Sequence, residues 1–333
     1  MQKSGGPRDG TKRWLVRYPR SVPVAIFLLV AAITGLSVYA IERGENQRAE
    51  AQLRNEASSI ASALERRANS SSAYLRAGSA LLSTLDEVPP SRFRRFVSEL
   101  RLDADYGGAD GIGWAMVVTP DKVAAFNAMM AEQGPGHPTL HPALAHSQPF
   151  AVPVTFLQPD TVRNRRALGF DMYSDPVRRA AMIDAQRNER PTASGGVVLE
   201  QEGDRPAAGF LIYMPVFGAD QFGRHLRGFI YSPFNAQDFL ASALELERPG
   251  PIGIRLYDRE ATPSHLLAEI SHSGRFGAAF SEPVTIANHQ WVLQVQSPRS
   301  TSLSGLSILT LVFGLLVASL LMLVVRMLTQ QAV

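Results

Sequence analysis

Two long apolar runs, one near each end of the chain, most constrain what it can fold into. They cover residues 22–41 and 303–325, and neither contains Asp, Glu, Lys or Arg. Each is long enough to cross a hydrocarbon core, which needs about 20 apolar residues. Only a helix satisfies the backbone hydrogen bonds inside such a core. The runs therefore predict two transmembrane helices that tether everything between them to a membrane.

The charges ahead of the first run predict the orientation. Six Lys and Arg residues and one Asp precede it, which favours a cytoplasmic amino terminus. Residues 42–302 are then periplasmic or extracellular, and the carboxyl terminus is cytoplasmic, as in a multi-pass inner-membrane protein. A cleaved signal peptide is the rival interpretation, since residues 38–40 (VYA) resemble a cleavage site. The run exceeds the usual signal-peptide core of roughly 7 to 15 residues, which favours an uncleaved anchor.

Composition excludes several classes of partner and chemistry. The segment 42–302 carries 26 Lys and Arg against 29 Asp and Glu, so it lacks the basic face that nucleic-acid binding requires. The basic excess lies at the amino terminus, where it serves topology and contact with anionic membrane lipid. The chain has no cysteine, which excludes disulfides and thiolate chemistry.

A long helix is predicted directly after the first apolar run. Residues 42–85 contain no proline. Small or apolar residues recur about every 3.6 positions, the period of one helix face: Leu53, Ala57, Ile60, Leu64, Ala68, Ser71, Leu75, Gly78 and Leu82. This stripe suits packing either on the helix's own domain or on a partner copy in a homodimer.

The remaining segment alternates predicted helices and strands. Helices are expected at 91–102, at 120–130 and after Asp175-Pro176. Strands are expected at 111–118, 150–157, 197–201, 209–217, 227–232, 252–257, 279–286 and 291–296, with a tight hairpin turn at Asn288-His289. Helices followed by neighbouring antiparallel strands indicate an α+β fold.

The spacing of the residues that could bind a metal or catalyse a reaction does not match a known site. Asp103, Asp105 and Gly107 suggest a calcium loop, but Trp114 stands where the loop needs a bidentate Glu. Three histidines lie in a loop rich in Pro and Gly that lacks the fixed geometry of a metal site: His137, His141 and His146. We therefore expect no metal, no cofactor and no enzymatic activity.

Two further groups also fall short of a catalytic pattern. Ser194 lies in TASGG, which is not the GxSxG nucleophile pattern. Glu200 and Glu202 would share one face of a strand, but many solvated pairs do so. Neither group indicates an active site.

The most specific local pattern surrounds Asp171. This acidic residue stands between Phe170 and Met172, immediately before a predicted helix. A carboxylate in that position either caps the turn or faces a pocket, where it can accept hydrogen bonds from a ligand. The spacing alone leaves both alternatives open.

The same region carries motifs of a known family. They are a Gly169-Phe170-Asp171 turn, a helix start at 174–180 (SDPVRRA), a Ser194-Gly195 turn, and two strands containing 209–217 (GFLIYMPVF) and 227–229 (RGF). Together with the flanking apolar runs they resemble the CHASE domain, the cyclase/histidine kinase-associated sensory extracellular domain. The resemblance covers about residues 91–240.

That resemblance implies a PAS-like, two-lobed extracellular sensor with a long amino-terminal helix, usually dimeric. In plant cytokinin receptors of this family, the carboxylate corresponding to Asp171 contacts an adenine-type ligand. The resemblance also places Leu199 and Gly228 near that pocket, and Phe170, Met172 and Tyr213 are further candidates. We therefore expect this chain to have the pocket, but we do not expect its ligand to be a cytokinin.

These expectations give a seven-part organisation. The parts are a basic cytoplasmic segment (1–21), a first membrane helix (22–41), a signalling helix (42–85), a CHASE core (86–245), a membrane-proximal lobe (246–302), a second membrane helix (303–325) and a cytoplasmic stub (326–333). The stub is too short for an effector, so we expect the output, a histidine kinase or a diguanylate cyclase or phosphodiesterase, to lie in another domain or partner.

The predicted function is that of a membrane-anchored receptor for a small extracellular or periplasmic molecule. The alternative is a membrane-tethered periplasmic module that binds a partner protein without a small-molecule ligand. The first hypothesis predicts a pocket that Asp171 helps to form. The second predicts that the pocket is filled by the chain's own side chains.

Overall fold

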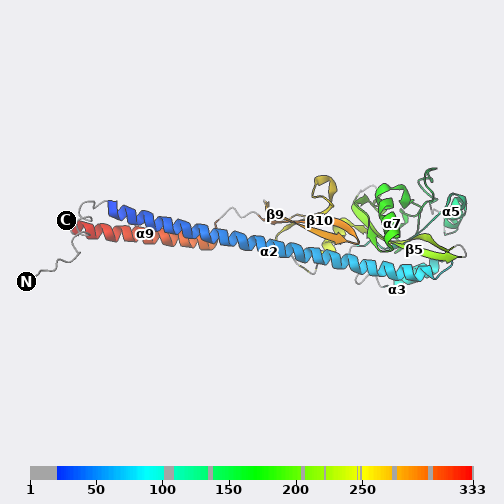
Figure 1. Cartoon of the computed structure of the whole chain (residues 1–333), viewed down its shortest axis with the longest axis horizontal. Helices are drawn as coiled ribbons and strands as arrows, with labels where there is room; N and C mark the ends of the chain where they lie inside the picture. The colour runs from blue at the N-terminus through cyan, green and yellow to red at the C-terminus, as the bar shows by residue number, and fades with distance from the viewer. Residues whose placement is uncertain are drawn as a thin grey trace, which may run out of the picture. The chain divides into compact units, whose positions relative to one another are not determined.

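A computed structural model describes residues 21–100, 109–133, 138–203, 207–220, 223–245, 247, 250–271, 276–298 and 303–331. The chain forms two compact units, one of residues 53–298 and one that combines 1–52 with 299–333. Figure 1 shows the elements of both units. Each unit is described by itself below.

The smaller unit contains the two apolar helices. They are the first part of α2 (Ser21–Ser83) and α9 (Gly305–Gln331). Both are long and apolar enough to cross a membrane, and only 6% of the most apolar window of each is buried. The helices pack closely, since a Cβ on Gly314 would lie 2.2 Å from Oγ1 of Thr34. The Glu42 carboxylate accepts a hydrogen bond from the Ser304 backbone N–H at 2.8 Å.

The rest of α2 belongs to the larger unit and buries the predicted stripe. Leu53, Ala57, Ile60, Leu64 and Leu75 are all at most 5% exposed and form one hydrophobic core with residues of both sheets. The stripe therefore packs on its own domain, the first of the two alternatives that the sequence left open. The homodimer stays a prediction.

The larger unit contains a six-stranded antiparallel sheet. Its strands are β1 (Ile112–Met116), β2 (Val154–Gln158), β3 (Thr192–Ala193), β4 (Val197–Val198), β5 (Ala208–Asp220) and β6 (Gly223–Asn235). Their order is β2-β1-β6-β5-β3, and β4 also pairs with β5. The antiparallel pairing agrees with the α+β class expected from the sequence.

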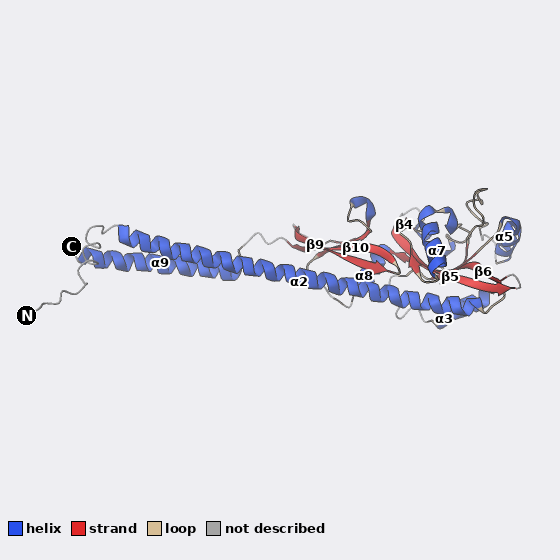
Figure 2. Ribbon diagram, viewed as in Figure 1, coloured by secondary structure: helices blue, strands red, loops and turns tan. Residues whose placement is uncertain are grey.

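Side chains of β5 and β6 alternate between two cores, because successive residues of a strand point to opposite faces. Phe210, Ile212 and Ile230 pack in the same core as α2. Leu211 and Tyr231 pack on the other face, in a core with residues of α5 (Val123–Glu132) and α7 (Pro176–Asn188). Figure 2 shows α2 and α7 on opposite sides of this sheet.

Short helices complete this part of the unit. They are α3 (Pro90–Glu99), η1 (Pro120–Lys122), α6 (Val162–Arg165), η2 (Met172–Ser174), η3 (Glu200–Glu202) and α8 (Ala236–Leu244). The predicted helix at 120–130 forms as η1 followed by α5. The predicted strand 197–201 is wrong beyond Val198, because the chain turns into η3. Glu200 and Glu202 therefore do not lie on a strand.

A second sheet of four antiparallel strands follows. It contains β7 (Gly253–Asp258), β8 (Leu266–Ile270), β9 (Phe276–Ile286) and β10 (His289–Pro298) in the order β8-β7-β10-β9, and η4 (Pro263–His265) precedes β8. The hairpin turn is at Ala287-Asn288, one residue before the predicted position, where φ is 43° and 66°. Two successive positive φ angles match the twist of a hairpin.

The two sheets share one core. The rings of Phe210 and Trp291 lie 4.8 Å apart, edge to face, and the Ala193 backbone N–H donates to the Ala287 carbonyl oxygen at 2.7 Å. The predicted division into lobes near residue 245 coincides with the end of α8. That division and the PAS-like description stay predictions.

Candidate functional site

Asp171 is the N-cap of η2 and is fully buried. Its Oδ1 accepts hydrogen bonds from the backbone N–H groups of Val152 (2.8 Å) and Tyr173 (3.0 Å). Its Oδ2 accepts from Nε2 of Gln148 at 3.4 Å. Burial raises the pKa of the Asp171 carboxyl, although these hydrogen bonds act in the opposite direction. These contacts are those of a turn cap, and whether Asp171 also contacts a ligand stays a prediction.

The residues on either side of Asp171 line a small cavity. Its volume is about 10 Å³, which is near the minimum that holds one water molecule. Three predicted residues, Phe170, Met172 and Leu199, contribute to its wall. The other lining residues are Val154, Ala167, Arg178, Glu200, Gln201, Leu211 and Tyr231. The structure thus brings together half of the predicted site residues.

Tyr213 and Gly228 lie outside that lining. Tyr213 is fully buried, and its hydroxyl donates to Sδ of the lining residue Met172 at 3.6 Å. Gly228 lies opposite Met116 and Val216 in the sheet. A Cβ there would lie 2.3 Å from the Ala115 carbonyl oxygen, so the glycine permits the close approach of two strands.

Two polar side chains on the cavity wall lack partners among the described residues. The Nε–H of Arg178 and the hydroxyl of Tyr231 make no hydrogen bond, and the residues are only 4% and 1% exposed. Burial raises the pKa of Tyr231 well above its usual range, which keeps its O–H as a donor. Buried groups without partners are rare in native proteins and call for an explanation.

The two terminal guanidinium nitrogens of Arg178 lie close to acceptor groups. Its Nη2 donates to the Val198 carbonyl oxygen at 2.7 Å, and its Nη1 lies 3.6 Å from Oδ2 of Asp175. Nη2 also lies 4.0 Å from Oε1 of Glu200. The guanidinium carbon lies 5.0 Å from the centre of the Phe170 ring. These contacts orient the guanidinium, and Nε–H is its buried group without a hydrogen-bond partner among the described residues.

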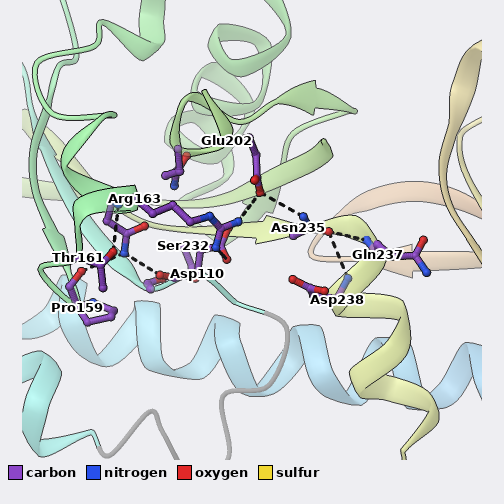
Figure 3. A network of polar contacts seen from close by, with 12 residues as sticks. Asp110, Pro159, Thr161, Arg163, Glu202, Ser232, Asn235, Gln237 and Asp238 are labelled. Carbon is purple, nitrogen blue, oxygen red and sulfur yellow. Dashed lines mark hydrogen bonds and ion pairs between the residues drawn. The ribbon is translucent and has the colours of Figure 1, made fainter. Parts of the chain in front are cut away.

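The turn η3 forms one wall of the cavity and is held by an ion-pair network (Figure 3). Arg163 pairs with the Glu202 carboxylate and, through both terminal nitrogens, with Asp110 at 2.7 and 3.2 Å. Nδ2 of Asn235 donates to Glu202 at 3.2 Å, and the Asn235 side-chain oxygen caps α8 through the N–H groups of residues 237 and 238. The network therefore joins the cavity wall to the first turn of α8.

A second cavity lies between the β4 region and the second sheet. Its volume is about 270 Å³, and Val197, Val198, Asp258, His265 and Leu267 are among its lining residues. Both oxygens of Asp258 have partners, since Nε2 of His289 lies 2.6 Å from Oδ1 and the Gly196 N–H donates to Oδ2 at 2.9 Å. Burial acts to raise the pKa of Asp258, but these two hydrogen bonds lower it on balance.

Among the described residues, the candidates for metal binding or catalysis do not form a cluster. Within the described ranges, no cluster of three or more His, Asp or Glu could hold a metal ion. His137 and the calcium-loop residues Asp103, Asp105 and Gly107 lie outside the described residues. Ser194 is buried, and its hydroxyl donates to the Gly195 carbonyl oxygen at 2.8 Å.

Comparison with known families identifies the larger unit. The family model for the CHASE domain matches residues 86–268, more than half of the chain. The chain therefore belongs to the CHASE-domain family and is an extracellular sensory module. No curated protein matches it.

Several solved structures match this chain at low sequence identity. An extracellular ligand-binding receptor from Desulfohalobium retbaense is 12% identical over 74% of this chain and 40% of its own, with a TM-score of 0.47. The ligand-binding domain of the Pseudomonas aeruginosa amino acid chemoreceptor PctC, in complex with GABA, is 15% identical over 76% of this chain and 99% of its own, with a TM-score of 0.40. This chain thus spans less than half of the first of these receptors.

Proposed function

We propose that the chain is the sensory part of a membrane-anchored receptor, and that the small cavity beside Asp171 is where it binds an extracytoplasmic molecule. The observation that carries the proposal is the cavity itself. It lies within the family-matched residues, and Phe170, Met172 and Leu199 line it together with two polar groups that lack partners. Asp171 holds the turn that presents Phe170 and Met172 to it.

Binding would require the cavity to widen. A volume of about 10 Å³ is far below the roughly 300 Å³ at which small-molecule sites begin. A ligand would therefore select a wider arrangement of the wall, and that preference is what can shift a two-state equilibrium. The turn η3, at residues 200–202, is the wall segment whose movement would also reach α8 through Glu202 and Asn235.

The signal would leave the domain through α2. This helix packs in the same core as both sheets and continues toward the amino terminus into the apolar run of residues 22–41. Arg67 of α2 donates to the Ser242 carbonyl oxygen of α8 at 3.0 Å. We propose a cytoplasmic amino terminus and an output domain of the histidine kinase or cyclic-dinucleotide type, supplied by another domain or partner.

A thermal-shift screen of the full chain in lipid nanodiscs tests the proposed site. Purines, amino acids and small organic acids are screened, and unfolding is followed through the fluorescence of the buried residues Trp114 and Trp291. A compound that binds the first cavity should lose its stabilising effect in Leu199→Phe, which fills the cavity. It should keep the effect in Val198→Phe, whose side chain is 54% exposed and lines the second cavity.

The two variants separate the possible outcomes. A hit that survives Leu199→Phe but not Val198→Phe would move the site to the second cavity. A hit that survives both variants would contradict binding at either cavity. The unfolding temperature of each variant without compound serves as the control for general loss of stability.

One observation favours the alternative of a protein-interaction module. That hypothesis predicts a filled pocket, and the cavity beside Asp171 has room for at most about one water molecule. If no compound stabilises the chain, crosslinking in membranes should recover a partner protein. Loss of that partner on substitution of exposed residues of the larger unit, with the fold intact, would support this alternative.

A further inference from the structure

The two unpartnered donors on the cavity wall define what a ligand must offer. Nε–H of Arg178 and O–H of Tyr231 are buried, and both belong to the lining of one cavity. A buried donor without an acceptor weakens the state that contains it. A ligand that brings an acceptor oxygen to these donors would remove that penalty, so the ligand-bound state gains relative to the empty one.

Apart from Arg178, Tyr231, Glu200 and Gln201, the wall is apolar. Val154, Ala167, Met172, Leu199 and Leu211 line the cavity beside the Phe170 ring. Such a surface favours a hydrocarbon body through burial of apolar area. Glu200 and Gln201 are the remaining polar residues of the lining, so a polar group of the ligand that does not reach them would be costly to bury.

The charge around Arg178 decides between a carboxylate and a neutral acceptor. Oδ2 of Asp175 lies 3.6 Å from Nη1, and Oε1 of Glu200 lies 4.0 Å from Nη2. Two carboxylates already lie near the single positive charge, so a third would be repelled by them and gain less from Arg178. A carbonyl oxygen accepts the same two hydrogen bonds without adding charge.

We infer that this cavity recognises an uncharged molecule with an apolar body and a carbonyl group, whose oxygen accepts hydrogen bonds from Arg178 Nε–H and Tyr231 O–H. The inference rests on the proposed function, because it assigns the ligand class of that same cavity. Arg178 and Tyr231 would then be binding residues, and the Tyr231 hydroxyl would favour ligands that carry a carbonyl oxygen. The inference also predicts discrimination against acids and amines of equal size.

Four probes of matched length test the inference: pentanamide and 2-pentanone carry a neutral carbonyl, pentanoate carries a carboxylate, and pentylamine carries a cation. Binding to the full chain in nanodiscs is measured as the rise in unfolding temperature with increasing probe concentration. The two carbonyl probes should stabilise the chain, pentanoate should bind at least about fivefold more weakly, and pentylamine should give no shift.

Two variants remove the donors. Tyr231→Phe deletes only the hydroxyl, and Arg178→Lys retains the charge but deletes Nε–H together with the Nη2 group that donates to the Val198 carbonyl oxygen. Each should weaken binding of the carbonyl probes roughly tenfold, as expected for a lost hydrogen bond in a buried site. The same substitutions in the second sheet, Tyr257→Phe and Arg255→Lys, lie outside the cavity and should leave binding unchanged.

The outcomes separate this inference from the proposed function. Equal or tighter binding of pentanoate, or unchanged carbonyl binding in Tyr231→Phe and Arg178→Lys, would overturn the carbonyl assignment. If no probe binds while the broader screen yields a compound sensitive to Leu199→Phe, the assignment fails and the receptor function stands. If neither the probes nor the screen yields binding, a bridging water is the better account of the two donors, and both proposals fail.

Discussion

The two cavities of the larger unit differ in volume and, in the opposite sense, in how many of their buried polar groups lack partners. The cavity between β4 and the second sheet is about 270 Å³, and the one beside Asp171 is about 10 Å³. The larger one has its carboxylate, Asp258, bonded by His289 and Gly196. The smaller one has two buried donors without acceptors, on Arg178 and Tyr231.

The proposed function chooses between the two cavities by unused hydrogen-bonding capacity and not by empty space. A cavity whose polar groups already have partners gains little from a polar ligand. A tight cavity with unpaired donors gains from a matching acceptor, provided that its wall can move. Substitutions made in pairs, one near each cavity, test this difference.

The largest effect is expected at two aspartates, the buried Asp171 and the partly exposed Asp258. Asp171→Ala removes the acceptor of two backbone N–H groups, those of Val152 and Tyr173. It should lower the free energy of unfolding by about 3 kcal/mol, because buried donors lose their partners. Asp258→Ala should cost about 1 kcal/mol, because its surroundings are more open to water. Chemical unfolding followed by tryptophan fluorescence measures both.

A cost at Asp171 no larger than that at Asp258 would mean that the turn does not depend on its cap. The ligand response adds a separate readout. If Asp171→Asn folds normally and still abolishes binding of a compound, then Asp171 contacts the ligand as the family resemblance implies.

A smaller effect is expected at two glycines. A Cβ on Gly228 would meet the Ala115 carbonyl oxygen at 2.3 Å, whereas on Gly196 it would meet a terminal methyl of Leu267 at 2.6 Å. Backbone cannot yield as a side-chain methyl can, so Gly228→Ala should cost about 2 kcal/mol and Gly196→Ala less than about 1 kcal/mol. Thermal unfolding of both variants checks this. Equal costs would contradict the assignment of Gly228 to strand packing.

Much of this architecture was predictable from periodicity. The stripe beginning at Leu53 has the 3.6-residue spacing of a buried helix face, and the strong strands at 209–217 and 227–232 lie within β5 and β6. Shorter elements escaped prediction. The two-residue strand β3 has too few residues to show a pattern, and η3 replaces a strand that the apolar pair Val197-Val198 suggested.

The candidate site was predictable only in part. Phe170, Met172 and Leu199 come from motif positions near the cavity, and they line it. Arg178 lay inside the recognised helix start and Tyr231 inside a predicted strand, but their significance depends on burial without partners. No sequence spacing reveals which donor lacks an acceptor, because that depends on how distant segments pack.

The same two aspartates predict opposite pH dependence on either side of the ordinary carboxyl pKa of 3.8. The folded-state pKa of Asp171 is raised by burial, so the native state binds the proton more tightly and stability falls as pH rises from 3.8 to the raised value. The pKa of Asp258 is lowered, so its contribution is present above 3.8 and is lost as pH falls through the lowered value.

Unfolding free energies measured across this pH range, in the wild type and in each Asn variant, test both signs. The difference between the wild type and Asp171→Asn should slope downward as pH rises above 3.8. For Asp258→Asn the slope should appear below 3.8 and have the opposite sign. A shared sign for both residues would contradict the environments described for them.

The smallest effect, and the most diagnostic, is expected at two tyrosines. Tyr231→Phe deletes a buried hydroxyl that has no partner, so the chain should become about 0.5 kcal/mol more stable. Tyr257→Phe deletes a hydroxyl that donates to Gln294 at 3.5 Å, and it should lose about 0.5 kcal/mol. The opposite signs matter more than the sizes, because they report whether each hydroxyl is satisfied in the unliganded chain. If Tyr231→Phe is destabilising while Tyr257→Phe behaves as expected, a bound water already satisfies the Tyr231 hydroxyl. The small cavity would then lose the property that distinguishes it from the larger one.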